Sequence, residues 1–240
     1  MRGGTDAPTP VRLGVEPARR PRQLLTAEPP ILSLVVDRAS TRHPLPAAVE
    51  AAFAHGADWL QIRDRELTGA ALLAWAGELA DAAVRGARRA GREAEIVVNR
   101  RLDIALAIGA DGAHLGFDAL DIRDARALLG ARAVLGVSAH SLAEVESAAR
   151  AGADYVHLAP VFDPLSKRST RPALGAAAVR AASRSEVRVI AQGGVTQANA
   201  GELVRSGAAG IAVTGAILQA TDPAAATRAL RAALTATGAG

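Results

Sequence analysis

From Ile31 onward, short runs of aliphatic and β-branched residues alternate with longer, alanine-rich stretches whose apolar residues recur every three or four positions. The short runs predict buried strands and the longer stretches predict amphipathic helices, because these spacings match the side-chain periods of the two structures. Helices are predicted over residues 70–90, 141–151 and 196–206. Strands are predicted over residues 31–36, 58–62, 95–98, 112–115, 133–137, 155–158, 187–191 and 210–213.

A weak internal repeat supports a count of eight units. Residues 56–58, 109–111 and 152–154 each read Gly-Ala-Asp, and residues 207–209 read Gly-Ala-Ala; each repeat ends a predicted helix and precedes a predicted strand. Glycine suits such a helix end because it adopts positive φ without strain. Eight βα units in about 210 residues predict an α/β fold, a single (β/α)8 TIM barrel over residues 30–240, and not a doubly wound sheet.

Composition narrows the possible functions. Half of the 240 residues are hydrophobic, but only six are aromatic and none is cysteine, so thiol chemistry is excluded and base stacking is not expected. The net charge of +4 is scattered, which argues against a nucleic-acid partner. No apolar run approaches the roughly 20 residues that span a bilayer, so we predict a soluble, cytoplasmic protein without a membrane partner. Residues 1–29, rich in proline and arginine, predict a flexible tail.

Glycine turns follow the last two predicted strands. Gly193 and Gly194 follow the seventh strand, and Thr214 and Gly215 follow the eighth. In a (β/α)8 barrel these two loops commonly bind phosphate through backbone N–H groups. We therefore predict a substrate phosphate site there; the alternative is that the glycines only permit tight turns.

Polar residues also follow the second and fifth strands. Gln61, Arg63 and Arg65 alternate along the chain, so an amide and two guanidinium groups are predicted to face the barrel mouth, where an anion suits them. The alternative for Arg63 is a salt bridge with Asp64 or Glu66. After the fifth strand, His140 is a candidate acid/base group unless it is structural.

The loop after the sixth strand is the longest βα loop and carries Lys167, the single lysine of the chain. A chain that otherwise uses arginine has kept one compact ammonium group, which suggests a chemical role there. The alternative is chance survival of a surface lysine. Long loops in compact barrels are often substrate clamps.

Several ordered motifs together resemble the thiamine phosphate synthase/TenI family over residues 31–222. By resemblance, the synthases ionise a hydroxymethylpyrimidine diphosphate with the help of Mg²⁺, and a thiazole phosphate attacks the resulting cation and releases diphosphate. Arg63, Arg65, Asn99 and Lys167 match the positions that hold the pyrimidine diphosphate, and the glycine turns match those that hold the thiazole phosphate. The motifs are residues 98–107, 109–116, 136–141, 152–155, 160–162 with Lys167, and 193–195 with Asn199.

The departures from this family pattern concern the metal. Arg100 stands where the resemblance implies a magnesium-binding aspartate, Ala119 replaces the second one, and Phe117 replaces a glutamine. Magnesium requires hard oxygen ligands, and a guanidinium group reverses the local charge. Asp118 compensates for one of these losses at most.

The leading expectation is therefore a TenI-like thiazole tautomerase, an isomerase that aromatises a carboxythiazole phosphate by a 1,3-proton shift without metal or cofactor. By resemblance, His140 is its acid/base, with Arg63 and Lys167 near the carboxylate, while Gln61, Arg65, Asn99, Phe117 and Ser138 line the substrate site. Two alternatives stay open: a divergent thiamine phosphate synthase, which needs Mg²⁺, and a non-catalytic metabolite-binding or regulatory protein. The expected partner is a phosphorylated thiazole, and a homo-oligomer is left open.

Overall fold

The computed structural model describes residues 30–116, 119–163 and 171–236. Eight parallel strands in this part of the chain form a closed barrel in sequence order, with β1 pairing both β2 and β8. The predicted TIM barrel is confirmed, and each predicted strand lies within about two residues of an observed one. The strands are β1 (Ile31–Val36), β2 (Trp59–Ile62), β3 (Glu95–Asn99), β4 (Gly112–Leu115), β5 (Val134–Ala139), β6 (Tyr155–Leu158), β7 (Arg188–Gln192) and β8 (Gly210–Val213).

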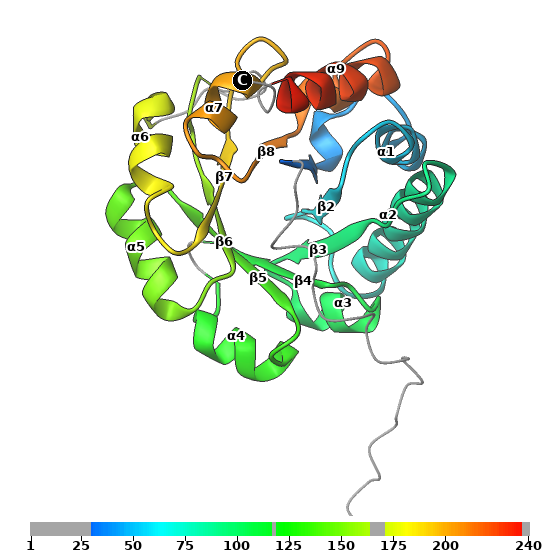
Figure 1. Cartoon of the computed structure of the whole chain (residues 1–240). Coiled ribbons are helices and arrows are strands. Elements are labelled where there is room, and N and C mark those ends of the chain that lie inside the picture. The colour runs from blue at the N-terminus through cyan, green and yellow to red at the C-terminus, as the bar shows by residue number, and fades with distance from the viewer. Residues whose placement is uncertain (1–29, 117–118, 164–170, 237–240) are drawn as a thin grey trace, which may run out of the picture.

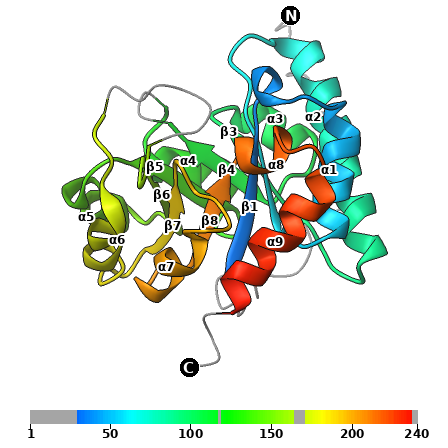
Figure 2. The same cartoon turned by 90° about the horizontal axis from the view of Figure 1, so that it is seen from above.

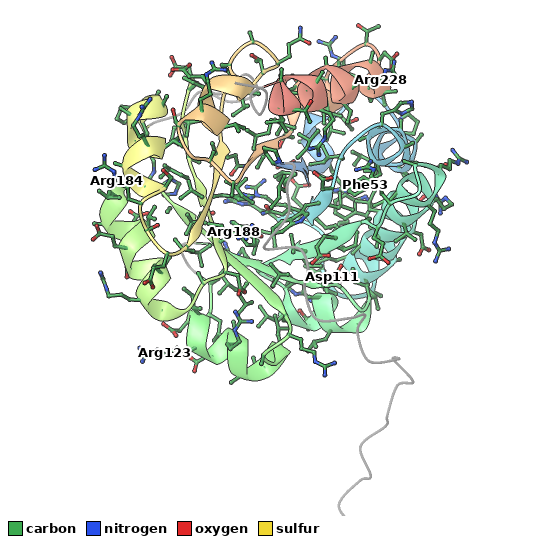
Figure 3. The ribbon with its side chains drawn as sticks, viewed as in Figure 1. Phe53, Asp111, Arg123, Arg184, Arg188 and Arg228 are labelled. Atoms are coloured by element: carbon green, nitrogen blue, oxygen red, sulfur yellow. The ribbon has the colours of Figure 1, made fainter. Side chains whose placement is uncertain are left out.

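Helices surround the strands (Figure 1). Each helix turns an apolar face inward; Phe53, fully buried on α1, lies on the barrel side of its helix (Figure 3). In contrast, Arg123, Arg184 and Arg228 lie on the outside of the ring of helices. The helices are α1 (Leu45–Ala54), α2 (Gly69–Arg89), α3 (Leu102–Ala107), α4 (Ile122–Leu129), α5 (Leu142–Ala151), α6 (Gly175–Ala182), α7 (Ala200–Arg205), α8 (Gly215–Leu218) and α9 (Pro223–Thr235), with a 3-10 turn at Arg38–Ser40.

Helix α7 differs from its prediction because it starts at Ala200, four residues later than the sequence indicated. Asn199 stabilises the preceding turn: its Oδ1 accepts a hydrogen bond from the amide of Thr196 at 2.8 Å, and its Nδ2 donates to the carbonyl of Gly194 at 3.0 Å. This turn supplies the polar connection after β7. In the part of the chain that the structure describes, no helix combines the length and apolar character needed to cross a membrane.

The barrel interior is filled by alternate strand residues, as the two-residue period of a strand requires. At mid-height the filling is mainly apolar, and Trp59 and Tyr155 meet there edge to face at 4.9 Å between ring centroids. Towards the carboxyl ends of the strands the interior becomes polar. The apolar interior cluster consists of Ile31, Val35, Trp59, Val97, Val134, Tyr155, Ile190 and Ala212.

The Gly-Ala-Asp repeat closes the opposite, amino-terminal end of the barrel. Oδ2 of each repeat aspartate accepts a hydrogen bond from a backbone amide on the preceding strand: Asp58 from Leu32 at 2.8 Å, Asp111 from Ile96 at 2.8 Å and Asp154 from Leu135 at 2.7 Å. The backbone amide of each aspartate in turn donates to the carbonyl oxygen of the strand residue whose amide it accepts from. The repeat therefore joins neighbouring strands, a role beyond the helix C-cap that the sequence predicted.

Arginines complete this end. Asp58 binds both Arg92, at 3.1 Å, and Arg231 of α9, and Asp154 binds Arg126 at 2.7 Å. The arginines also donate to main-chain carbonyls; Arg231, for example, donates to the carbonyl of Pro30 at 2.7 Å. The amino-terminal end of the barrel is thus closed by paired charges.

Candidate active site at the carboxyl ends of the strands

The predicted site residues that the structure describes gather at one end of the barrel. Parallel strands in a closed barrel all open their carboxyl ends on the same face, which carries the active site in enzymes of this fold. Phe117 and Lys167 lie outside the described residues, so their predicted roles stay predictions. The residues brought to this face are Gln61, Arg63, Arg65, Asn99, Ser138, His140, Gly193, Gly194, Thr214 and Gly215.

Gln61, Arg63 and Arg65 follow one another from the interior to solvent. Gln61 is buried and donates to Oδ1 of Asn99 at 3.2 Å, whereas its Oε1 has no hydrogen-bond partner within the described residues. Arg63 is half-buried and forms an ion pair with Asp37, the residue that follows β1. Arg65 is exposed. The end of β2 and the loop that follows it therefore present three polar groups at three depths.

The partner of Arg63 differs from the one the sequence suggested. Asp64 and Glu66 bind Arg38 instead, at 2.7 and 2.9 Å. Burial works to raise the pKa of Asp64, but the amides of Leu67 and Glu66 and the Arg38 guanidinium outweigh it and lower that pKa. These acids therefore hold the loop after β2, and Asp37 alone pairs with Arg63 among the described carboxylates.

His140 lies directly after β5 with one tautomer favoured. Its Nδ1 lies 2.6 Å from the carbonyl oxygen of Ala159, which can only accept a hydrogen bond, so Nδ1 carries the proton. The backbone amide of His140 donates to Glu144 at 2.7 Å and fixes the start of α5. Nε2 of the neutral ring is consequently a lone-pair acceptor, the form that a general base requires.

A hydrogen-bonded chain of three side chains runs through the barrel interior to Ser138 on β5. The Tyr155 hydroxyl lies 3.1 Å from Nδ1 of His114, and Nε2 of His114 lies 3.0 Å from the Ser138 hydroxyl. Burial, followed by the charges of His157 and Arg63, lowers the pKa of His114 well below its usual value. His114 is therefore neutral.

His157 occupies the last inward position of β6. It is 1% exposed, and its ring centroid lies 4.4 Å from that of His114. Burial lowers the pKa of His157 to about 3, and the side chain of Gln192 opposes that shift. Neither ring nitrogen of His157 has a hydrogen bond of normal geometry in the described residues. His114 and His157 are thus buried strand residues, the first hydrogen-bonded to Tyr155 and Ser138 and the second packed against the first.

The glycine turn after β7 is shaped by packing. A Cβ on Gly193 would lie 2.9 Å from Pro160, and one on Gly194 would lie 2.4 Å from the carbonyl oxygen of Asp163. Both glycines also have positive φ, of 95° and 62°. The loop after β6 therefore sits directly on this turn, which accounts for the glycines without a ligand. A phosphate site at the two turns stays a prediction.

The residues at the implied metal position do not suit magnesium. Arg100 is the one non-glycine residue with a positive φ, 66°, in the described ranges, and it follows Asn99 at the end of β3. Ala119 offers no side-chain oxygen. The described residues contain no cluster of three or more His, Cys, Asp or Glu side chains able to hold a metal ion. The donors present in these ranges thus do not fit a divalent cation.

The fold and these side chains define a (β/α)8 barrel with a polar site at the carboxyl ends of its strands. The chain matches the family described as thiamine monophosphate synthase over residues 32–217 and belongs to that family. This finding confirms the resemblance read from the motifs.

Relatives extend over most of the chain. It is 40% identical to a thiamine-phosphate synthase of Chloroflexus aurantiacus over 192 residues, 80% of this chain and 86% of the relative. It is 47% identical to a thiamine-phosphate synthase of Salinispora tropica over 144 residues, 60% of this chain and 69% of the relative. Among solved structures, it resembles a thiamine phosphate pyrophosphorylase from Pyrococcus furiosus, with 29% identity, a TM-score of 0.73 and coverage of 86% and 96% of the two chains.

Proposed function

We propose that this protein is a thiamine-phosphate synthase, which joins a hydroxymethylpyrimidine diphosphate to a thiazole phosphate. The observation that carries the proposal is the name shared by relatives that are 38–40% identical over 80–83% of the chain. These relatives favour the synthase over the tautomerase that the sequence favoured. In the proposed reaction, the thiazole nitrogen forms a bond to the methylene carbon of the pyrimidine, and the bond from that carbon to the diphosphate oxygen breaks.

Arg63 is the group best placed to bind the diphosphate. It is half-buried at the mouth, and its ion pair with Asp37 fixes the direction of the guanidinium group. A diphosphate carries more charge than one carboxylate and accepts several hydrogen bonds, so it competes well for the remaining guanidinium N–H groups. Arg65, which is exposed above it, adds a second positive charge.

The thiazole phosphate is assigned to the turns after β7 and β8. Within the described residues, the amides of Gly194 and Gly215 donate no backbone hydrogen bond in these turns. Free backbone amides at these two loops are the usual phosphate donors of the fold. Because the barrel is closed by the pairing of β1 with β8, β8 and β7 lie two and three strands from β2, so the proposed phosphate site would lie within one part of the mouth together with Arg63.

The test incubates the purified protein with hydroxymethylpyrimidine diphosphate, thiazole phosphate and Mg²⁺ and measures thiamine phosphate by its fluorescent oxidation product. Formation of thiamine phosphate, reduced in Arg63→Met, is the expected result. No product beside an active control synthase contradicts the proposal. Repeating the assay with a chelator in place of Mg²⁺ measures how far turnover depends on a divalent metal.

A second candidate, the thiazole tautomerase, is favoured by one specific observation. Arg100 and Ala119 stand where the resemblance implies carboxylates that bind Mg²⁺ for diphosphate ionisation, whereas the Ala159 carbonyl leaves Nε2 of His140 as a base. A 1,3-proton shift needs such a base and no metal: Nε2 removes a proton from one ring atom, and the resulting acid returns a proton to another.

The tautomerase is tested by supplying the unaromatised carboxythiazole phosphate and following its conversion by ultraviolet absorbance and by deuterium incorporation from D₂O. His140→Gln should abolish this conversion while leaving the affinity for the aromatic product, measured by calorimetry, within about twofold. Unchanged conversion in that variant removes His140 from the mechanism. Binding without turnover in either assay supports the third possibility, a non-catalytic metabolite-binding protein.

A further inference from the structure

The buried chain Tyr155–His114–Ser138 has a defined direction. Tyr155 and His114 are 0% and 1% exposed, whereas Ser138 is partly exposed at the mouth. The two links measure 3.1 and 3.0 Å. The chain therefore runs from the dry interior of the barrel to the candidate site and ends at a predicted substrate-binding hydroxyl.

Packing fixes the Tyr155 end. A Cβ on Gly136 would lie 2.0 Å from Cζ of the Tyr155 ring, so the phenol lies against the bare backbone of β5. Trp59 meets the same ring edge to face at 4.9 Å. The glycine in the Gly136–Ser138 segment thus makes room for the phenol whose hydroxyl reaches His114. A well-packed aromatic ring between these neighbours keeps its hydroxyl at one position.

Proton positions follow from the partners. Burial raises the pKa of Tyr155, so its hydroxyl stays protonated, and within the described residues its one hydrogen-bond partner is Nδ1 of His114. A buried O–H without an acceptor costs about 1–3 kcal/mol. Tyr155 therefore donates to Nδ1, and the neutral ring of His114 carries its proton on Nε2 and donates to the Ser138 oxygen.

We infer that His114 and Tyr155 are positioning residues that orient the Ser138 hydroxyl as a hydrogen-bond donor towards the substrate. Because a lone pair of the Ser138 oxygen is occupied by His114, the serine hydrogen points away from His114. The inference rests on the proposed binding site and requires an acceptor on the substrate, such as a ring nitrogen or a phosphate oxygen. It applies to synthase and tautomerase alike because both bind a thiazole phosphate.

The test is a double-mutant cycle of Tyr155→Phe and Ser138→Ala. Removing the phenol hydroxyl leaves Nδ1 of His114 without its hydrogen-bond donor, so the ring can carry its proton on either nitrogen and the Ser138 hydroxyl can point either way. KM for thiazole phosphate should therefore rise about three- to tenfold, with kcat little changed. In the Ser138→Ala background the same Tyr155→Phe change should have less than a twofold effect. Equal effects of Tyr155→Phe in both backgrounds overturn the inference.

Ser33→Ala is the matched control. Ser33 is a buried hydroxyl on β1 inside the same barrel, without a hydrogen-bond partner in the described residues. Its loss should leave KM within twofold. A Ser33→Ala effect as large as that of Tyr155→Phe overturns the inference, because any interior change would then disturb the site.

Two readouts separate this inference from the proposed function. If the wild-type protein turns over neither substrate set, the cycle is measured as the Kd for thiazole phosphate by calorimetry, with the same expected coupling. Independently of any ligand, ¹⁵N NMR of the histidine rings, with His114 assigned from His114→Gln, should find the Nε2–H tautomer in the wild type. An Nδ1–H tautomer contradicts the inference even if the enzyme is active.

Discussion

The two ends of the barrel differ in how their polar side chains are partnered. At the amino-terminal end, Asp58, Asp111 and Asp154 bind backbone amides, and arginines bind two of these carboxylates. At the carboxyl end, the interior holds groups without a hydrogen-bond partner in the described residues: Oε1 of Gln61 and both nitrogens of His157. The repeat aspartates of the first end are satisfied by the protein itself, although Nε1 of Trp59 and Oγ of Ser206 near that end are also buried without a partner in the described residues.

The difference separates stability from function. A paired carboxylate stabilises the fold when both partners are present, whereas a buried polar group without a partner costs free energy that a ligand can recover. We therefore expect substitutions at the amino-terminal end to change unfolding and leave KM alone. Substitutions of the residues that line the mouth at the carboxyl end should mainly change KM, whereas the buried histidines below them also make stability depend on pH.

At neutral pH, the largest effect is expected at Asp58. Asp58→Ala leaves the amide of Leu32 and the guanidinium groups of Arg92 and Arg231 without their shared acceptor, which should lower the free energy of unfolding by about 2–4 kcal/mol. Urea unfolding followed by circular dichroism measures it. Asp81→Ala, at an exposed carboxylate of α2, is the control and should change stability by less than about 0.5 kcal/mol. A large rise in KM for Asp58→Ala would erase the distinction between the ends.

The next effect concerns pH and the buried histidines. His157 has a pKa of about 3 in the folded protein and about 6.5 when unfolded, so between these values the unfolded chain binds the extra proton. Stability from this residue is fully present above pH 6.5 and falls as the pH drops towards 3, by up to about 1.4 kcal/mol per pH unit. The lowered pKa of His114 acts in the same direction.

Urea unfolding of the wild type and of His157→Leu between pH 4 and 7 isolates this contribution. The variant should lose stability less steeply as the pH falls. Parallel curves for the two proteins would mean that His157 is protonated or solvated in the folded state, contrary to its burial.

The smallest of the three effects is expected at Arg63. Arg63→Met removes a guanidinium group from the mouth, and the loss of a charge-assisted hydrogen bond of about 1.5–3 kcal/mol should raise KM for the diphosphate substrate roughly 10- to 100-fold. Asp37 stays partly satisfied because it also accepts from the amide of Ala39 at 3.1 Å. Steady-state kinetics measure the change. Arg38→Met, which removes the neighbouring arginine that binds Asp64 and Glu66, should leave KM within a few-fold and is the matched control.

Much of the fold was predictable because its signals are local. The aliphatic runs located all eight strands, and the Gly-Ala-Asp repeat marked the turns at the amino-terminal end. The role of the aspartates was missed, although their presence in three of four repeats was a signal: each binds a strand that lies 15–26 residues earlier in the chain. Ala209, in the fourth repeat, has no carboxylate to do this.

The site was predictable in its location and less so in its contacts. Alternation placed Gln61 and Arg63 at the mouth, but the pairing of Arg63 with Asp37 depends on how β1 lies beside β2, and no local pattern encodes this register. The same alternation along β4 and β6 would have turned His114 and His157 inward, so a chain of hydrogen bonds there was within reach of the sequence. The identities of the hydrogen-bond partners were not predictable, because they depend on distances between side chains that the sequence does not give.

One contact from α9 bears on when the barrel can form. Arg231 donates to the carbonyl of Pro30, 201 residues earlier in the chain, and to Asp58 and the carbonyl of Gly56. During synthesis, the first two βα units leave the ribosome long before residue 231 exists. We therefore expect the early βα units to remain an open sheet. The pairing of β1 with β8, which closes the barrel, should form only after nearly the whole chain has been translated. Early release of the nascent chain before α9 should accordingly yield an open, protease-sensitive intermediate.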